Sequence, residues 1–199
     1  MKLNSSTAVV GKTVILVPYK KKHVPKYHKW MQRKDLQEAT ASEPLSIEEE
    51  HEMQQTWFRD DDKCTFIVLD KEIMDRKHDE IEAMIGDANL YLSTAEDERI
   101  AECGIMIAEN MQRGKGKGFE TLTLLLKYGC DFLNIEKYVA KISFDNVSST
   151  NLFKKVGFQM IEENHVFSES TLSLSVDERF KTWLKETIAD GYSVTTYVE

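Results

Sequence analysis

The sequence predicts an α/β domain with one layered sheet, and three features of the 199-residue chain support this class. Apolar runs of strand length alternate with longer amphipathic runs of helical period. A glycine-rich segment, Arg113 to Gly118, separates a run of strand type from a run of helix type. The order is mixed strands first, then strand, glycine loop, helix, strand, helix and strand, which is typical of helices that cover a sheet.

The first half of the chain predicts three strands and two helices. The strands are expected at 13–17, 63–70 and 83–93, and the helices at 23–33 and from 46 to about 58. Pro18 stops the first strand because proline lacks the N–H that a ladder needs. Ser46 and Glu49 have the spacing of a capping box, which starts the second helix. We expect the charged stretch 71–82 to be a solvated hairpin loop.

The second half predicts four strands and three helices. The strands are expected at 100–109, 138–144, 158–161 and 171–174, and the helices at 119–133, 148–156 and 176–189. No repeat and no Pro/Gly/Ser-rich linker interrupts the chain, so residues 1–199 are predicted to form a single domain.

Charge and cysteine content narrow the function classes. The chain carries 26 basic and 34 acidic side chains, a net charge of −8, which argues against a nucleic-acid or membrane-surface binder. Cys64, Cys103 and Cys130 stand singly, without metal-ligand spacing, so we expect a reduced, cytoplasmic chain and no metal. No run reaches the roughly 20 apolar residues of a membrane span, and the first residues lack a signal-peptide core.

The glycine-rich segment predicts an anion site. A strand that passes through small residues into a helix leaves backbone N–H groups unpaired at the positive end of the helix. The Walker pattern fails because no Lys-Ser or Lys-Thr follows the glycines, and the dinucleotide pattern started at Gly114 meets Phe119 where its last glycine belongs. A flexible basic turn is the alternative reading of this segment.

What fits is the spacing Arg113-x-x-Gly116-x-Gly118, which resembles the acetyl-coenzyme A loop of the GCN5-related N-acetyltransferases, the GNAT superfamily. The run from Asn146 to Phe158 resembles the second signature of that superfamily, in which an Asn leads into a short helix that ends at Gly-Phe. Asn146 and Gly157 also have the residue types that merely begin and end a helix. The two signatures occur in the expected order.

The N-terminal part of the sequence resembles that of a narrower group, the N-acetyltransferase 9-like proteins. The matching runs are 11–19, 23–25, 27–31, 40–45 and 62–70. This resemblance implies a single GNAT fold, with a mixed, mostly antiparallel sheet splayed between its fourth and fifth strands and flanked by helices. It also implies acetyl-CoA as co-substrate, α- and β-tubulin N-termini as acceptors, a role in microtubule stability and a cytoplasmic, microtubule-associated location.

The resemblance further implies which residues bind the coenzyme. The backbone of Met106, Ile107 and Ala108 would pair with the pantetheine arm, and an N–H of Met106 or Ile107 would polarise the thioester. The remaining positions of the expected coenzyme site are Arg113, Gly114, Lys115, Gly116, Lys117, Gly118, Asn146, Asn151 and Phe153.

The expected catalytic and acceptor residues are fewer. Glu102 stands on the strand before the loop, where many family members carry a carboxylate that deprotonates the amine, although a strand-end Glu is more often solvated. Phe153 replaces the Tyr that many members use as general acid. Glu43 is expected to contact the incoming amine, or alternatively to face water in a turn beside Pro44.

Three function classes stay open. The first is an N-terminal protein acetyltransferase, which suits a site with few titratable groups because an α-amine, with a pKa of about 7.7–8.0, is partly neutral at cellular pH. The second is an acetyltransferase for lysine or small amines. The third is a catalytically weak acetyl-CoA-binding, microtubule-associated protein, which Phe153 keeps open. The acceptor and the oligomeric state do not follow from the sequence.

Overall fold

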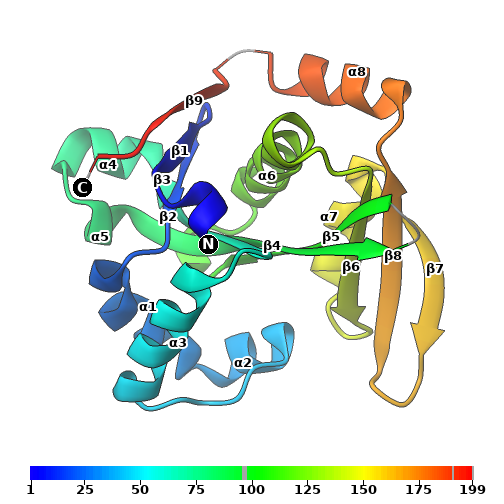
Figure 1. The fold of residues 1–199 in the computed structure, drawn as a ribbon. Coiled ribbons are helices and arrows are strands. Elements are labelled where there is room, and N and C mark those ends of the chain that lie inside the picture. The colour runs from blue at the N-terminus through cyan, green and yellow to red at the C-terminus, as the bar shows by residue number, and fades with distance from the viewer. Residues whose placement is uncertain (96–97, 190, 199) are drawn as a thin grey trace.

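The computed structural model describes residues 1–95, 98–189 and 191–198, whose strands form one nine-stranded sheet in the order β7-β8-β6-β5-β4-β3-β2-β1-β9 (Figure 1). The strands are β1 Thr7–Val10, β2 Val14–Pro18, β3 Lys63–Asp70, β4 Met84–Ala95, β5 Glu98–Ile107, β6 Lys137–Ser143, β7 Gln159–Asn164, β8 Glu169–Ser175 and β9 Ser193–Thr196. The helices are α1 Val24–Met31, α2 Lys34–Thr40, α3 Ile47–Arg59, α4 Lys71–Lys77, α5 Glu80–Ala83, α6 Lys117–Leu133, α7 Val147–Val156 and α8 Glu178–Thr187. This arrangement confirms the α/β class with one mixed, mostly antiparallel sheet.

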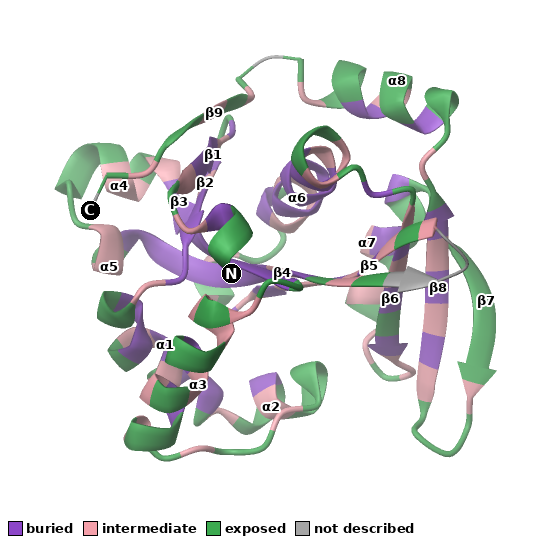
Figure 2. Cartoon of the chain, in the orientation of Figure 1, coloured by how far each residue is buried: buried purple, intermediate pink, exposed green. Residues whose placement is uncertain are grey.

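Helices cover both faces of the sheet, and two buried apolar clusters result (Figures 1 and 2). β3 is buried along its whole length, so its alternating side chains serve both clusters. Phe66 and Val68 belong to the cluster that includes α6, whereas Ile67 and Leu69 belong to the cluster that includes α1. We call the side of the sheet covered by α6 the α6 face and the side covered by α1 the α1 face.

Most predicted elements are confirmed, and one prediction is wrong. The strand 63–70 has the predicted bounds, and Ser46 and Glu49 form the capping box at the start of α3. The stretch 71–82 is not a hairpin loop but contains α4 and α5. The Asp70 carboxylate accepts from Ile73 N–H, and that of Asp79 accepts from Glu82 N–H, so two N-caps stabilise these short helices despite their charge.

The sheet is splayed between β5 and β6, as the resemblance implies. These two strands are parallel and pair only over Ile100–Lys137, Ala101–Tyr138 and Glu102–Val139. Beyond Glu102, β5 continues to pair with β4 as far as Ile107, while β6 continues with β8. Among the described residues, the edge of β5 from Cys103 to Ile107 therefore has no neighbouring strand on the β6 side.

No helix of the described residues is both long enough and apolar enough to cross a membrane.

Candidate functional site

A cavity of about 490 Å³ lies at the open edge of β5, between α2, the glycine loop and α7. Its lining joins segments far apart in the sequence. The lining residues are Asp35, Leu36, Ala39, Thr40, Ile105, Met106, Ile107, Arg113, Gly114, Gly116, Gly118, Phe119, Asn146, Ser148, Ser149, Leu152 and Lys155. The structure thus brings the glycine loop and the Asn146 segment to one site, as the two sequence signatures predict.

The glycine loop has a backbone that only glycine adopts easily. Gly114 has φ +70° and Gly116 has φ +80°, both in the left-handed region. Gly116 is also the N-cap of α6 and supplies no side-chain acceptor, so the first-turn N–H groups have no partner from the cap residue. Gly118 lines the cavity without a side chain of its own. Together these features suit a pyrophosphate at the positive end of α6.

Arg113 supplies charge at the mouth of this cavity. Its Nε donates to the main-chain oxygen of Ile107 at 2.7 Å, and its guanidinium lies 3.9 Å from the Asp35 carboxylate. The hydrogen bond from Arg33 is the main cause that holds the pKa of Asp35 below its usual value. Arg113 therefore lies between an anion of α2 and the edge of the strand, and it is the loop's only basic side chain that lines the cavity.

The backbone groups of β5 alternate between two directions, toward β4 and toward the open edge of the sheet. Ala108 N–H donates to Ile85 O, toward β4, whereas Ile107 C=O accepts from Arg113 at the open edge. In an antiparallel ladder a residue directs its N–H and its C=O to the same neighbour, and the next residue directs them the other way. Ile105 and Ile107 therefore present their backbone groups to the cavity. Met106 and Ala108 present theirs to β4, so this geometry does not favour the backbone contacts to the coenzyme expected of them, which stay predictions.

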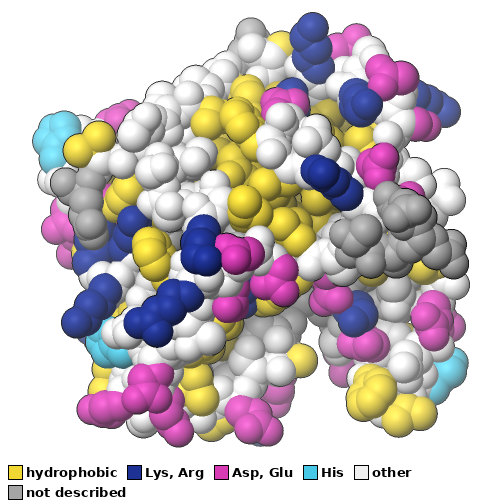
Figure 3. Space-filling view, in the orientation of Figure 1, with side chains coloured by type: hydrophobic (Ala, Val, Ile, Leu, Met, Phe, Trp, Pro, Cys, Tyr) yellow, Lys and Arg dark blue, Asp and Glu magenta, His cyan; other side chains and the backbone are white. Residues whose placement is uncertain are grey.

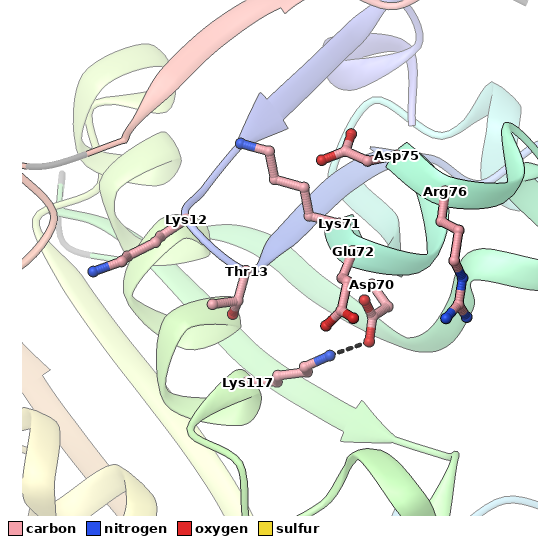
Figure 4. A pocket seen from close by; sticks show the side chains of 8 residues that line it. All are labelled: Lys12, Thr13, Asp70, Lys71, Glu72, Asp75, Arg76 and Lys117. Carbon is pink, nitrogen blue, oxygen red and sulfur yellow. Dashed lines mark hydrogen bonds and ion pairs between the residues drawn. The ribbon is translucent and has the colours of Figure 1, made fainter.

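The Lys117 side chain does not line the expected coenzyme cavity. Its ammonium group forms an ion pair with Asp70 inside a second hollow, of about 560 Å³, that borders the start of α6 (Figure 4). The pKa of Asp70 is low: burial acts to raise it, but the hydrogen bonds from Lys117 and Ile73 N–H prevail. The side-chain charge predicted to bind coenzyme is thus already neutralised. Lys115 is exposed and lines another hollow, beside α6 and residues 186–192.

α7 places a different set of residues in the cavity from the one predicted. Asn146 lines it and also caps the helix, because its side-chain oxygen accepts from Ser149 N–H at 3.1 Å. The cavity face of α7 then follows the helical period through 148, 149, 152 and 155. Asn151 lies off this face and is exposed. Phe153 is buried against Phe158, with ring centroids 4.9 Å apart, so the expected coenzyme contacts of Asn151 and Phe153 stay predictions that this geometry does not favour.

Neither the expected general base, Glu102, nor the expected amine contact, Glu43, lines the cavity. Glu102 is at the closed end of the splay, paired with Lys141 of β6 at 3.0 Å. Glu43 is exposed in the segment between α2 and α3. Their predicted roles as general base and amine contact stay predictions that this geometry does not favour.

A buried polar group on the α1 face of β4 was missed by sequence reasoning. Asp87 is 4% exposed, and its Oδ2 accepts from Asn89 at 2.8 Å and from the Tyr27 hydroxyl at 3.3 Å. Burial raises the pKa of Asp87 to about 6, while these two hydrogen bonds and the charge of Lys63 act to lower it. The signal in the sequence was an Asp, with Asn89 two residues later, inside the strand from Met84 to Leu90.

Two further parts of the cavity lining, α2 and Lys155, belong to no motif that is recognisable in the sequence. α2 is short and polar, which hides its contribution of Asp35, Leu36, Ala39 and Thr40. Lys155 adds a second positive charge and lies 4.6 Å from the centroid of Phe119. Within the described ranges, no group of three His, Cys, Asp or Glu side chains is placed to hold a metal ion.

Known proteins resemble this chain in sequence over most of its length. The Acetyltransferase (GNAT) domain family matches residues 13–159. An N-acetyltransferase 9-like protein of Nematostella vectensis is 51% identical, covering 86% of this chain and 87% of that protein. The Alpha/beta-tubulin-N-acetyltransferase 9 of Homo sapiens is 46% identical, covering 94% of this chain and 91% of that protein.

Solved structures with low sequence identity share the fold. A spermidine N-acetyltransferase from Vibrio cholerae, in complex with CoA and spermine, has a TM-score of 0.70 at 19% identity and covers 82% of this chain and 95% of its own. A ribosomal alpha-N-protein acetyltransferase, in complex with coenzyme A, has a TM-score of 0.66 at 16% identity and covers 84% and 96%.

Proposed function

This chain belongs to the GNAT acetyltransferase family, and on that premise we propose that it acetylates the N-terminal α-amines of proteins, with α- and β-tubulin as its acceptors. The family and its relatives make it an acetyl-CoA-dependent N-acetyltransferase. The observation that carries the narrower proposal is the extent of its similarity to proteins named as tubulin N-acetyltransferases, which spans nearly the whole chain.

The cavity residues fit acetyl-CoA, which supplies the acetyl thioester. The left-handed turn at Gly114 and Gly116 brings backbone N–H groups of the α6 start to the cavity, and Arg113 and Lys155 add positive charge for the phosphates. Ile105 and Ile107 offer hydrogen-bonding groups at the open strand edge, where an extended arm can add as a strand would. The apolar side chains of Leu36, Phe119 and Leu152 exclude water from that arm.

An α-amine suits this site better than lysine does. Its pKa of about 7.7–8.0 leaves part of it neutral at cellular pH, whereas a lysine, at about 10.4, is almost fully charged. Among the described residues that line the cavity, the only ionisable side chains are Asp35, Arg113 and Lys155. A site with so few acid–base groups at the coenzyme favours an acceptor that needs little deprotonation.

The proposal takes residues 1–199 as one acetyltransferase domain, since all strands of its described residues share one sheet. It places the protein in the cytoplasm, in contact with microtubules, because tubulin is the proposed acceptor.

The test is acetyl transfer to peptides, followed by intact mass. One set carries the N-terminal sequences of α- and β-tubulin with free amines, and a matched set has blocked N-termini and one internal lysine. We expect acetylation of the free N-termini only. Transfer to the lysine set alone would assign the enzyme to lysine or small amines. Coenzyme binding without transfer to any peptide or to tubulin would support a catalytically weak binding protein.

A further inference from the structure

A vacant space lies over the middle of β5, on the α1 face of the sheet. A Cβ built on Gly104 would meet no other atom within 4 Å, although the strand is central in the sheet. Gly104 is directly opposite Asn89 of β4, so the space is bordered by the α1-face side chains of both strands. It is also next to Ile105, the first β5 residue that lines the coenzyme cavity.

The molecular surface is notched between α2 and α3 on one side and the β6–β8 lobe on the other (Figures 1 and 3). Because β5 and β6 separate after Glu102, this notch corresponds to the side where the sheet opens. An acceptor chain can therefore approach β5 from the face opposite α6.

The α1-face side chains of β4, namely Asp87, Asn89 and Tyr91, form a row along the strand. Asp87 is the carboxylate at the end of this row that is nearer the coenzyme cavity. It lies directly opposite Met106, a cavity-lining residue, and strand partners of this kind are about 5 Å apart between Cα atoms. Glu102 is four residues before Met106 on the same strand, and at about 3.3 Å per residue this is roughly 13 Å. Glu102 also lies opposite Tyr91, near the end of the ladder where β5 still pairs with β6.

Hydrogen bonds from two neighbouring side chains hold the Asp87 carboxylate in place. Tyr27 of α1 and Asn89 of β4 donate to its carboxylate. The other ionisable groups that face this cluster are Tyr19 after β2, Glu50 of α3, Lys63 of β3 and Tyr91 of β4. Lys63 is directed toward Tyr91, to whose hydroxyl it donates at 3.1 Å, at the far end of the row.

We propose that the space over Gly104 receives the acceptor amine and that Asp87 takes the proton which the amine loses in the transfer. This rests on the proposed function. As the amine nitrogen bonds to the acetyl carbon, the C–S bond breaks and its electron pair stays on sulfur. The excess proton on nitrogen passes to the Asp87 carboxylate, which returns it to solvent, and the thiolate takes a proton from solvent. Tyr27 and Asn89 are positioning residues, because they act through Asp87.

The experiment measures kcat from pH 5.5 to 9 at saturating acetyl-CoA and peptide, for the natural protein and for Asp87→Asn. The variant keeps the shape and the hydrogen-bonding capacity of the side chain but cannot accept a proton. We expect a loss of about 100-fold or more in kcat. The acidic limb of the profile, expected near pH 6 from the pKa of Asp87, should disappear. The Kd for acetyl-CoA should change less than twofold.

Two further variants test whether Asp87 is the group that takes the proton. Glu102→Gln tests the other carboxylate of this region: if Asp87 takes the proton, the acidic limb near pH 6 should remain in Glu102→Gln. Tyr27→Phe removes a hydrogen bond that favours the charged carboxylate, so its acidic limb should move to higher pH. If Asp87→Asn does not fold, this shift decides the question.

An acidic limb that persists in Asp87→Asn, or a loss of both limb and activity in Glu102→Gln, would overturn the assignment. Failure of the proposed function is distinguishable from this result. If the natural protein acetylates lysine peptides instead, the tubulin proposal fails, and the same variants still test Asp87 on the amine that is accepted.

Discussion

The Nε of Arg113 donates to the main-chain oxygen of Ile107 at 2.7 Å, so the first residue of the glycine loop bonds to the same strand edge at which we propose that the pantetheine arm binds. Ile107 directs its backbone groups to the open side of the splay, where no strand competes for them. We expect coenzyme binding at this edge to replace this hydrogen bond. Once released, the guanidinium is free to pair with the pyrophosphate, which makes Arg113 a group that exchanges one partner for the other.

Replacing Arg113 should weaken the binding of acetyl-CoA but not the binding of a coenzyme fragment that lacks the pyrophosphate. Arg113→Ala removes a charge-assisted contact to phosphate, and we expect the Kd for acetyl-CoA to rise about tenfold. Acetyl-pantetheine lacks the pyrophosphate, so it should bind Arg113→Ala as tightly as the natural protein or more tightly. Isothermal titration calorimetry with both ligands measures this, with the exposed, cavity-external Lys115→Ala as control. Equal weakening of both ligands would contradict the exchange of partners.

The two loop glycines should respond differently to an added methyl group. Gly116 has φ +80°, so Gly116→Ala should lower the free energy of unfolding by about 1 kcal/mol and also weaken coenzyme binding. A Cβ on Gly118 would meet Leu152, Ile105 and Ile107 side chains no closer than 3.5 Å. Gly118→Ala should therefore fold normally.

Gly118→Ala should nevertheless weaken acetyl-CoA binding, because its methyl group enters the lining of the cavity. Thermal unfolding and coenzyme titration of both variants separate the two effects. Normal coenzyme affinity in the larger replacement Gly118→Val would exclude this cavity as the coenzyme site.

Lys117 should matter for folding and not for the coenzyme. Its ion pair with Asp70 is nearly buried, with side-chain exposures of 11% and 3%, so Lys117→Met leaves a buried carboxylate without its cation. We expect a loss of about 3 kcal/mol in the free energy of unfolding, measured in urea. The double variant Lys117→Met/Asp70→Asn should recover part of it. A tenfold loss of coenzyme affinity in folded Lys117→Met would instead return Lys117 to the coenzyme site.

Asp87 should lower stability in a pH-dependent way. Its pKa is raised from 3.8 to about 6 in the folded state, so between these values the folded protein binds more protons than the unfolded chain. Stability therefore falls as the pH rises from about 4 to 6, and the full cost is present above pH 6. Asp87→Asn should be more stable than the natural protein by about 1–3 kcal/mol at pH 8.

This difference should be small near pH 4, where Asp87 is protonated in the folded protein and partly protonated in the unfolded chain. At pH 8, Lys63 adds little to the comparison, because burial lowers its own pKa to about 7 and leaves it mostly neutral. Urea unfolding at pH 4, 6 and 8 measures the trend. A stability difference that stays constant over this range would mean that Asp87 is charged at all three pH values.

The sequence predicts best those features that depend on local chemistry. The apolar run 63–70 must be a buried strand, and Ser46 with Glu49 must start a helix, because neither depends on distant partners. The glycine loop is recognisable for the same reason, since positive φ restricts the residue type. β1 and β9 are four-residue strands whose formation depends on pairing, β9 with β1 and β1 also with β2, which no local pattern reveals.

Side-chain direction is the part that local patterns do not predict. The charge of Lys117 fits a phosphate loop in the sequence, yet its partner is Asp70, 47 residues earlier in the chain. Phe153 and Asn151 belong to a motif that reaches the cavity, but helical periodicity turns Ser148, Ser149 and Leu152 toward it instead. Asp87 gains its significance only when β4 and β5 are in register and Gly104 leaves the space beside it vacant.

The most direct measurement of the central claim uses folded tubulin and acetyl-CoA with an isotopically labelled acetyl group. Purified αβ-tubulin with unmodified N-termini is incubated with the protein, digested, and mapped by mass spectrometry for labelled acetyl groups. We predict label on the N-terminal α-amines of both tubulin chains and none when acetyl-CoA is omitted. Label on internal lysines alone, or no label although the protein binds acetyl-CoA, would contradict it.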